Sequence, residues 1–267
     1  MKHCAILLLI ALLPAPGLSG EQNVNDDAAE ETKKEQVLDA AQAEALVAQL
    51  ASAKREVHTA AADRLAEAGE QALPALLKQA RSKNETLRAR VTAVLGRIDS
   101  PQALDGIYPQ LRDKSPEVCC EAIRAVGNQR KPESIDRLRP FLLNKDPLFR
   151  LETVMALGRI GDSLALPEVK RAAADDDPNV RKAAVAALGL IGDTSAIGTL
   201  IDSLGDEHKT VRAIAYAALK TISGTDFTFK PDDDEATREE AVQLWKTWWE
   251  TQKKGDTGGN AGKETEK

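Results

Sequence analysis

The sequence of 267 residues predicts an all-α protein, a solenoid of stacked helix pairs, from three observations. A pattern of 31 residues recurs along most of the chain, each copy has the apolar spacing of amphipathic helices, and only 3% of the residues are aromatic. So few aromatic side chains leave the core to Leu, Val, Ile and above all Ala, which is the best helix former and a poor strand former. The composition therefore argues against an all-β fold.

The first element is an expected export signal over residues 1–20. Lys2 precedes a ten-residue apolar run at 4–13, and small residues follow up to Ser19 and Gly20, where we expect cleavage. The run is too short to span a bilayer, which takes about 20 apolar residues. We expect a protein exported to the periplasm or exterior, with no stable membrane span after cleavage; a retained anchor is the alternative.

Polar segments flank the predicted solenoid. Residues 21–36 and 253–267 contain almost nothing to bury, so both are expected to be disordered. The formal net charge of the whole chain is −6. A mildly acidic chain has no general affinity for nucleic acid or anionic lipid, so neither is an expected partner.

The repeat region is expected over residues 37–224. In one well-formed copy, Val180, Ala184 and Leu188 lie on a stripe of helical spacing, and Asp177 is a suitable N-cap. Each copy then carries a second amphipathic helix. Neither helix can bury its stripe alone, so successive copies must stack. The copies begin at Asn84, Ser115, Asp146, Asp177 and His208.

The motif D-P-x-V-R-x-x-A-x-x-A-L-G-x-I-G-D, complete from Asp177 to Asp193, resembles the short bacterial HEAT-like repeat, also called the phycobilisome-lyase-type HEAT repeat. The resemblance covers roughly residues 43–224. It implies a right-handed α-solenoid of about five and a half helix-turn-helix repeats with a C-terminal capping helix. It implies little about chemistry, because such repeats occur in bilin lyases, hydroxylases and binding scaffolds.

Arginine recurs at one position of the first helix and predicts a structural role. Aspartates at 113, 175 and 206 lie near the end of the second helix, so we expect ion pairs that bridge adjacent repeats. The arginines are Arg88, Arg150, Arg181 and Arg212, and the remaining copy carries Cys119 at this position.

The sequence offers little for catalysis. His58 and His208 lie about five repeats apart, the paired His-Glu motifs of the deoxyhypusine hydroxylases are absent, and there is no Walker loop or dinucleotide fingerprint. We expect no enzyme activity, catalytic residue, metal site or cofactor. One alternative stays open, a lyase-like or enzyme-accessory function that would use the adjacent Cys119 and Cys120.

Positions of the second helix that vary between copies form the expected interaction surface. Basic residues gather on the central second helices and are missing from the fifth. One edge of the solenoid should therefore change from basic to acidic along its length, and it would suit a partner whose charges are arranged in the opposite order. A merely solvated face is the alternative interpretation. The candidate partner-binding residues are Tyr108, Arg112, Arg139, Lys170 and Arg171.

The last element, residues 225–252, holds five of the nine aromatic residues and should cap the stack. An amphipathic helix is expected from about Glu235 to Thr251, with tryptophans that cover the last repeat. The segment G-x-D-F-x-x-x-P…R-E-E-A-V-x-x-W-x-x-W-W also resembles a tail found on exported bacterial HEAT-repeat proteins. A tryptophan platform for a cell-wall glycan is the alternative. The cap residues are Phe227, Phe229, Trp245, Trp248 and Trp249.

The function that these features favour is a non-catalytic scaffold or adaptor in the bacterial cell envelope or exterior. It would bind another, unidentified protein along one face, as a monomer.

Overall fold

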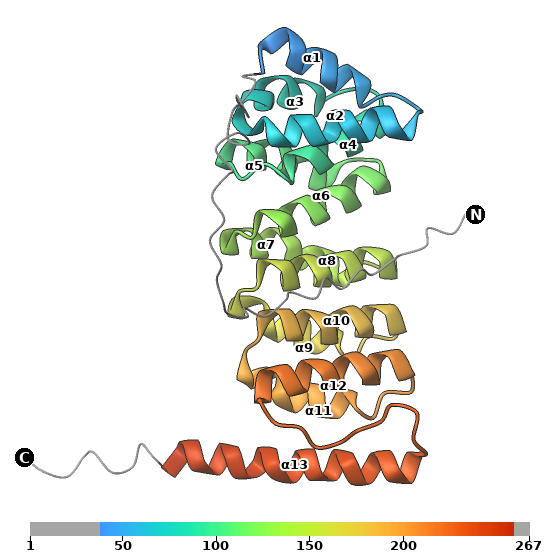
Figure 1. Ribbon diagram of the computed structural model, residues 1–267, viewed down its shortest axis with the longest axis vertical. Coiled ribbons are helices and arrows are strands. Elements are labelled where there is room, and N and C mark those ends of the chain that lie inside the picture. Colours follow the sequence, from blue (N-terminus) through green and yellow to red (C-terminus); the bar gives the residue numbers. More distant parts are fainter. Residues whose placement is uncertain (1–37, 259–267) are drawn as a thin grey trace, which may run out of the picture. The chain divides into compact units, whose positions relative to one another are not determined.

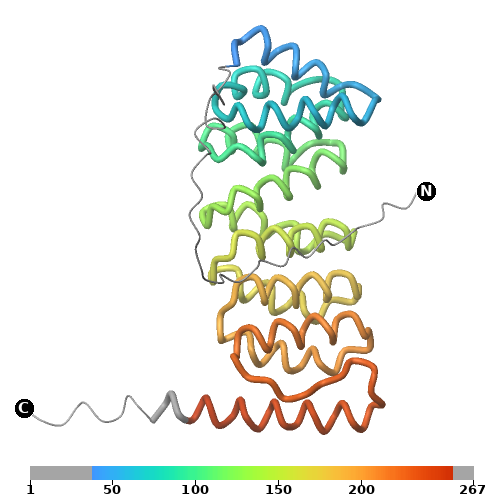
Figure 2. Tube along the Cα trace, in the orientation of Figure 1, coloured from blue at the N-terminus to red at the C-terminus, as the bar shows by residue number. Residues whose placement is uncertain are grey.

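The computed structural model describes the backbone of residues 38–258 and the side chains of residues 38–254. The expected signal (1–20), the expected polar linker (21–36) and residues 259–267 of the expected tail lie outside the described residues. Over the described range the chain forms thirteen α-helices and six short 3₁₀ helices, with no strand. These helices stack in sequence order (Figures 1 and 2), so the predicted fold class, an α-solenoid, is confirmed.

Six long helices, here named the A row, are the first helices of the repeats. Asp177 accepts hydrogen bonds from two amides of the first turn of its helix, and Pro178 occupies the first helical position. Gly161, Gly192 and Gly224 end three of these helices with φ between 65° and 75°, a conformation that favours glycine. The A row consists of α2 (Arg55–Glu67), α4 (Glu85–Leu95), α6 (Pro116–Gln129), α8 (Pro147–Ile160), α10 (Pro178–Ile191) and α12 (Lys209–Ser223).

Each A-row helix except α12 is followed by a second segment, and these segments form the B row. They are shorter than the dozen helical residues expected, because prolines such as Pro109 and Pro140 lack the amide that continues α-helical bonding. The α-helices are α3 (Leu73–Gln79), α5 (Pro101–Ile107), α7 (Ile135–Leu138), α9 (Leu166–Ala172) and α11 (Ile197–Ser203). The 3₁₀ helices are η1 (Gly69–Ala72), η2 (Tyr108–Arg112), η3 (Pro132–Ser134), η4 (Arg139–Leu143), η5 (Ser163–Ala165) and η6 (Thr194–Ala196).

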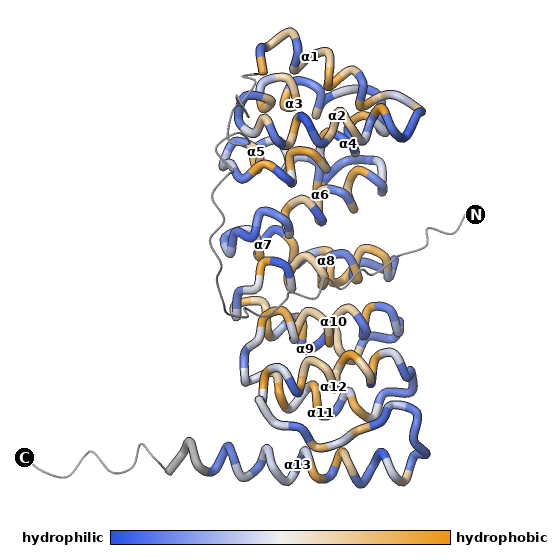
Figure 3. Tube along the Cα trace, viewed as in Figure 1, coloured by the Kyte–Doolittle hydropathy of each residue, from blue (hydrophilic) through white to orange (hydrophobic). Residues whose placement is uncertain are grey.

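Two further helices lie at the ends of the stack. α1 (Ala40–Gln49) packs against α2 and α3, and α13 (Glu235–Gly258) packs against α11 (Figure 1). Apolar residues recur along all the stacked helices, whereas the turns between them are mostly hydrophilic (Figure 3). Within the described residues, no helix combines the length and the apolar character needed to cross a membrane.

Glycine and alanine allow neighbouring A-row helices to approach closely. A Cβ atom built on Gly127 would lie 2.7 Å from the Cα atom of Ala156, and one built on Gly158 would lie 2.8 Å from the Cα atom of Ala187. Real Cβ atoms essentially never come this close to another carbon. Glycine recurs at this position every 31 residues, at Gly96, Gly127, Gly158 and Gly189, and marks the places where neighbouring A-row helices approach most closely.

Arginine–aspartate pairs connect successive repeats along one edge of the A row, and these pairs are here together called the ladder. The Nε and Nη2 atoms of Arg150 lie 2.8 and 2.7 Å from the two carboxylate oxygens of Asp175, and Nη1 donates to the carbonyls of Asn144 and Lys145. Asp175 also accepts the amide of Asp177, which fixes the turn into α10. Equivalent pairs join Arg88 to Asp113 and Arg181 to Asp206.

The α6–α8 step of this ladder has neither charge. Cys119 replaces the arginine, and the position of the aspartate is occupied by Asn144, so no unpaired charge is left inside. The Sγ atom of Cys119 donates to the carbonyl of Leu111 instead. A different bidentate pair connects the same two helices, because Arg124 of α6 donates to both carboxylate oxygens of Glu152 at 2.8 and 2.5 Å.

Removing one carboxylate of the ladder should destabilise the protein in a pH-dependent way. The hydrogen bond from Arg150 holds the pKa of Asp175 below its ordinary value. A lowered pKa contributes stability above the ordinary aspartate value of about 3.9, and this contribution is lost as the pH falls through the lower, folded value. We expect Asp175→Asn to lower the free energy of unfolding by about 1–2 kcal/mol at pH 7, and by progressively less below pH ~4.

Urea unfolding of wild type and variant at several pH values measures this difference. Asp99→Asn is the matched control, because the Asp99 side chain is 82% exposed in its pair with Lys131, and such pairs contribute little. Equal effects of the two substitutions would contradict the stabilising role of the ladder.

The aromatic segment covers the last repeat. Trp245 is completely buried, and its ring makes edge contacts with Phe227 at 5.0 Å and Trp248 at 5.7 Å between centroids. Phe229 is also buried and lies 5.5 Å from the ring of Tyr216 in α12. Arg212, the last arginine of the ladder, donates to the carbonyl of Pro231 in the same segment. The capping helix predicted from the sequence is therefore anchored both by its rings and by the end of the ladder.

The capping helix is longer than the sequence predicted. α13 reaches Gly258, whereas we expected it to end near Thr251 and residues 253–267 to be disordered. Lys253 pairs with Glu250 one turn earlier and lies 6.0 Å from the ring centre of Trp249. These local contacts stabilise the last turns of the helix although the residues stay exposed. We expected disorder here because the segment has little to bury, and that reasoning takes no account of contacts within the helix.

Candidate protein-binding surface

The five candidate partner-binding residues lie on three consecutive B-row segments. Tyr108 begins η2, and its hydroxyl lies 2.8 Å from the Oγ atom of Ser134 in the next segment. The guanidinium carbon of Arg137 is 4.1 Å from the centre of the Tyr108 ring. Arg112, at the end of η2, is exposed and has no partner among the described residues. Tyr108 thus connects two B-row segments, whereas Arg112 stands alone.

Arg139, Lys170 and Arg171 lie close to the junction of the third and fourth B-row segments. Arg139 pairs with Asp136 and, across the junction, with Glu168, whose Oε1 atom is 3.0 Å from Nε. Lys170 donates to the hydroxyl of Ser195 in the following segment. Arg171 is exposed and makes no ion pair within the described part of the chain. The structure therefore brings together three of the five residues.

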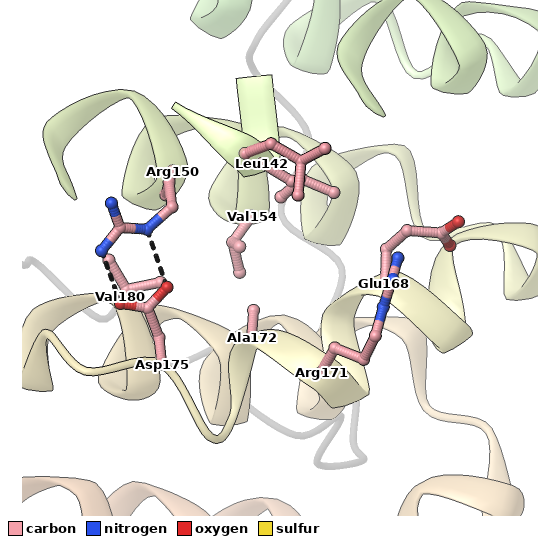
Figure 4. A pocket seen from close by; sticks show the side chains of 9 residues that line it. Leu142, Arg150, Val154, Glu168, Arg171, Ala172, Asp175 and Val180 are labelled. Atoms are coloured by element: carbon pink, nitrogen blue, oxygen red, sulfur yellow. Dashed lines mark hydrogen bonds and ion pairs between the residues drawn. The ribbon is translucent and has the colours of Figure 1, made fainter. Parts of the chain in front are cut away.

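A pocket of about 150 Å³ lies at this junction (Figure 4). Leu142, Val154 and Ala172 face one another across it, with the Arg150–Asp175 pair on one side and Glu168 beside Arg171 on the other. Leu143 and Val180 complete the lining. The pocket is apolar in the middle and charged at two opposite sides.

The pocket lies beside the third B-row segment, which has the shortest α-helix of the row. α7 has only four residues, and none of the residues of η4 that follow it is buried. Leu143 is 83% exposed, although it occupies the position of Arg81 and Arg112 in earlier copies. Sequence reasoning missed both this leucine and Glu168. An apolar leucine at a position that holds arginine in the two preceding copies was the signal that could have revealed the site.

The two cysteines are poor candidates for nucleophiles. Cys119 is 6% and Cys120 4% exposed, and both are free. Burial raises the pKa of each thiol to about 11. The reactive species is the thiolate, so little of it is present at neutral pH.

We expect iodoacetamide to leave Cys119 and Cys120 almost unmodified in the folded protein at pH 7. Labelling should become fast only in denaturant, which exposes the thiols and returns their pKa to the ordinary range. Mass spectrometry of timed samples measures the two rates. Rapid modification of either thiol in the native protein would instead support the lyase-like alternative.

Two histidines and one tryptophan of the described chain lie in structural positions. The Nδ1 atom of His58 lies 3.1 Å from the carbonyl of Ser52, and His208 is the N-cap residue of α12. In the part of the chain that the structure describes, no three His, Cys, Asp or Glu side chains are grouped as they would be to hold a metal ion. Trp245 is closed to solvent, so its ring is not available to stack on a sugar.

The fold and this surface define a class, the α-helical repeat proteins, whose stacked units present an extended face to other proteins. The family model described as HEAT repeats matches residues 104–177 and 169–244, together more than half of the chain. The chain therefore belongs to the HEAT-repeat family.

Solved structures resemble the chain to different degrees. The YibA protein of Escherichia coli is 19% identical, with 69% of this chain and 76% of that chain covered and a TM-score of 0.55. A designed armadillo repeat protein in complex with the peptide (KR)4 is 22% identical, covers 68% of this chain and 99% of its own, and has a TM-score of 0.46. Human deoxyhypusine hydroxylase is 18% identical, with coverages of 69% and 97% and a TM-score of 0.32. Among curated proteins no match is found.

Proposed function

We propose that the protein is a non-catalytic scaffold that holds another protein along its B row. The observation that carries the proposal is the surface over the second to fourth B-row segments. Arg112 and Arg171 are both exposed there without ion pairs among the described residues, and Arg171 lies beside an open apolar pocket. Charged groups around an apolar centre are typical of surfaces that bind proteins. The buried thiols give a catalytic alternative no comparable support.

We further propose export to the bacterial cell envelope or exterior, on the basis of the apolar run at 4–13. N-terminal sequencing of the protein purified from its native host tests this part. A mature chain that begins after Ser19 or Gly20 is the expected result, and an intact N-terminus on a cytoplasmic protein would contradict it.

Affinity capture tests the scaffold. The purified protein, immobilised and exposed to an envelope extract with crosslinking, should retain one protein in stoichiometric amount. The double variant Arg112→Glu and Lys170→Glu reverses two charges of the B row and should reduce this retention. Arg64→Glu is the matched control, because Arg64 is an exposed arginine of α2 without an ion pair among the described residues.

Two outcomes would refute the proposal. One is the absence of any stoichiometric protein. The other is equal retention by wild type, the B-row variant and the A-row control, which would place the interaction elsewhere.

A further inference from the structure

Given the proposed scaffold function, on which this inference rests, we propose that the pocket beside η4 and α9 is a specific peptide-binding site. It takes one apolar side chain of an extended segment of the partner, and Arg171 binds an acidic group next to that side chain. The partner chemistry is thus an acidic peptide with an apolar anchor.

The apolar part of the proposal rests on the lining of the pocket. Leu142, Val154, Ala172 and Val180 surround a volume of about 150 Å³, which is comparable to an apolar cavity that accommodates benzene. Leu143 stands at the pocket with 83% of its surface exposed. An aromatic or leucine side chain entering here would remove this surface from water, which is the main source of affinity at the centre of an interface.

The charged part rests on Arg171. This residue lines the pocket as an exposed guanidinium without an ion pair in the described chain, and a side-chain carboxylate of the peptide can pair with it. Glu168 is already engaged, because its Oε1 atom lies 3.0 Å from the Nε atom of Arg139 and its Oε2 atom is closed to solvent.

Two other occupants fit the pocket less well. Glu168 and Asp175 are paired with Arg139 and Arg150, so Arg171 is the charge at the pocket without an ion pair in the described chain, and it would repel a basic segment. The pocket lining contains no aromatic ring on which a nucleic-acid base could stack. Charge complementarity therefore selects an acidic segment.

Fluorescence anisotropy with labelled seven-residue peptides tests the proposal on the full-length protein. The reference probe has phenylalanine between two aspartates in a glycine–serine background. We expect it to bind in the range of about 10⁻⁵ to 10⁻³ M. Exchange of its phenylalanine for alanine, or of its aspartates for lysines, should each weaken binding about tenfold.

Protein variants assign the effect to the pocket. Arg171→Glu should weaken the aspartate probe about tenfold and improve binding of the lysine probe, and Leu143→Ser should weaken both. Both residues are exposed, and circular dichroism will verify that the variants fold. Arg112→Glu, which changes an exposed arginine outside the pocket, should leave the affinity of the aspartate probe unchanged.

The proposal is overturned if no probe binds at about 1 mM, if the phenylalanine and alanine probes bind equally, or if Arg112→Glu acts like Arg171→Glu. The experiments distinguish a wrong assignment of the pocket from a wrong assignment of the scaffold function. A captured partner that is lost with Arg112→Glu and Lys170→Glu but retained by Arg171→Glu and Leu143→Ser would leave the scaffold intact and reject the pocket.

Discussion

Gly158→Val is expected to lower the free energy of unfolding by at least about 3 kcal/mol. A Cβ atom at this position would lie 2.7 Å from the Cβ atom and 2.8 Å from the Cα atom of Ala187, so the obstacle is backbone that cannot rotate away. α8 and α10 would have to separate. Because each repeat contacts only its neighbours, the loss should concentrate at this junction. Thermal unfolding measures the size of this loss of stability. Hydrogen exchange of α8 and α10 shows whether the loss is located at their junction.

Gly158→Ala is a more discriminating variant, because the helix propensity of alanine should stabilise the protein whereas the clash with α10 should destabilise it. Glycine to alanine inside an unobstructed helix stabilises it by about 1 kcal/mol. We expect Gly158→Ala to destabilise the protein nevertheless, since the clash involves the first side-chain atom. Gly198→Ala is the control, because Gly198 lies within α11 and a Cβ atom there would meet only the Nε1 atom of Trp249, at 3.5 Å. A stabilised Gly158→Ala variant would show that the two helices have room to separate.

Trp245→Ala should remove about 4 kcal/mol of stability, the range found when a large buried aromatic side chain is deleted. Trp245 is fully buried and contacts two other aromatic rings of the cap. The deletion would leave a cavity against the last repeat. We expect faster hydrogen exchange in α11 and α12 and little change in α2, since the damage lies at one end of the stack.

The adjacent Leu244 provides the control for this experiment. Its side chain is 57% exposed on the same helix, so Leu244→Ala should change stability by less than about 0.5 kcal/mol. If both variants unfold like wild type, α13 is not a cap, and the glycan-binding alternative gains support.

The sequence predicted those parts of the fold that depend on neighbouring residues. Asp177, Pro178 and Gly192 are start and stop signals that act within one helix, and the 31-residue period shows that such helices must stack. The pairing of arginine with aspartate could be predicted for the same reason, because both residues keep fixed positions in the repeat.

The missed features arise from departures from the repeat. The pocket lies beside α7, the shortest α-helix of the B row, where Leu142 is only partly buried and Leu143 is exposed. The pair of Arg124 with Glu152 occurs at one step only, so no column revealed it. The repeat period predicts the contacts of residues that recur in every copy, whereas the candidate site is formed by residues that differ between copies.

The Cys119–Asn144 step has a consequence for the mechanics of the molecule. Each bidentate pair of the ladder resists the hinge-like opening of one helix against the next. At this step the same edge carries no such pair among the described residues, and the thiol of Cys119 donates to Leu111 of η2, which precedes α6. The Arg124–Glu152 pair still connects the two helices through another position. The α6–α8 step therefore depends on one position of the helix pair, whereas the α8–α10 and α10–α12 steps are held at the ladder edge. A force that bends the stack away from this edge should separate α6 and α8 there before it parts the helices that the ladder joins.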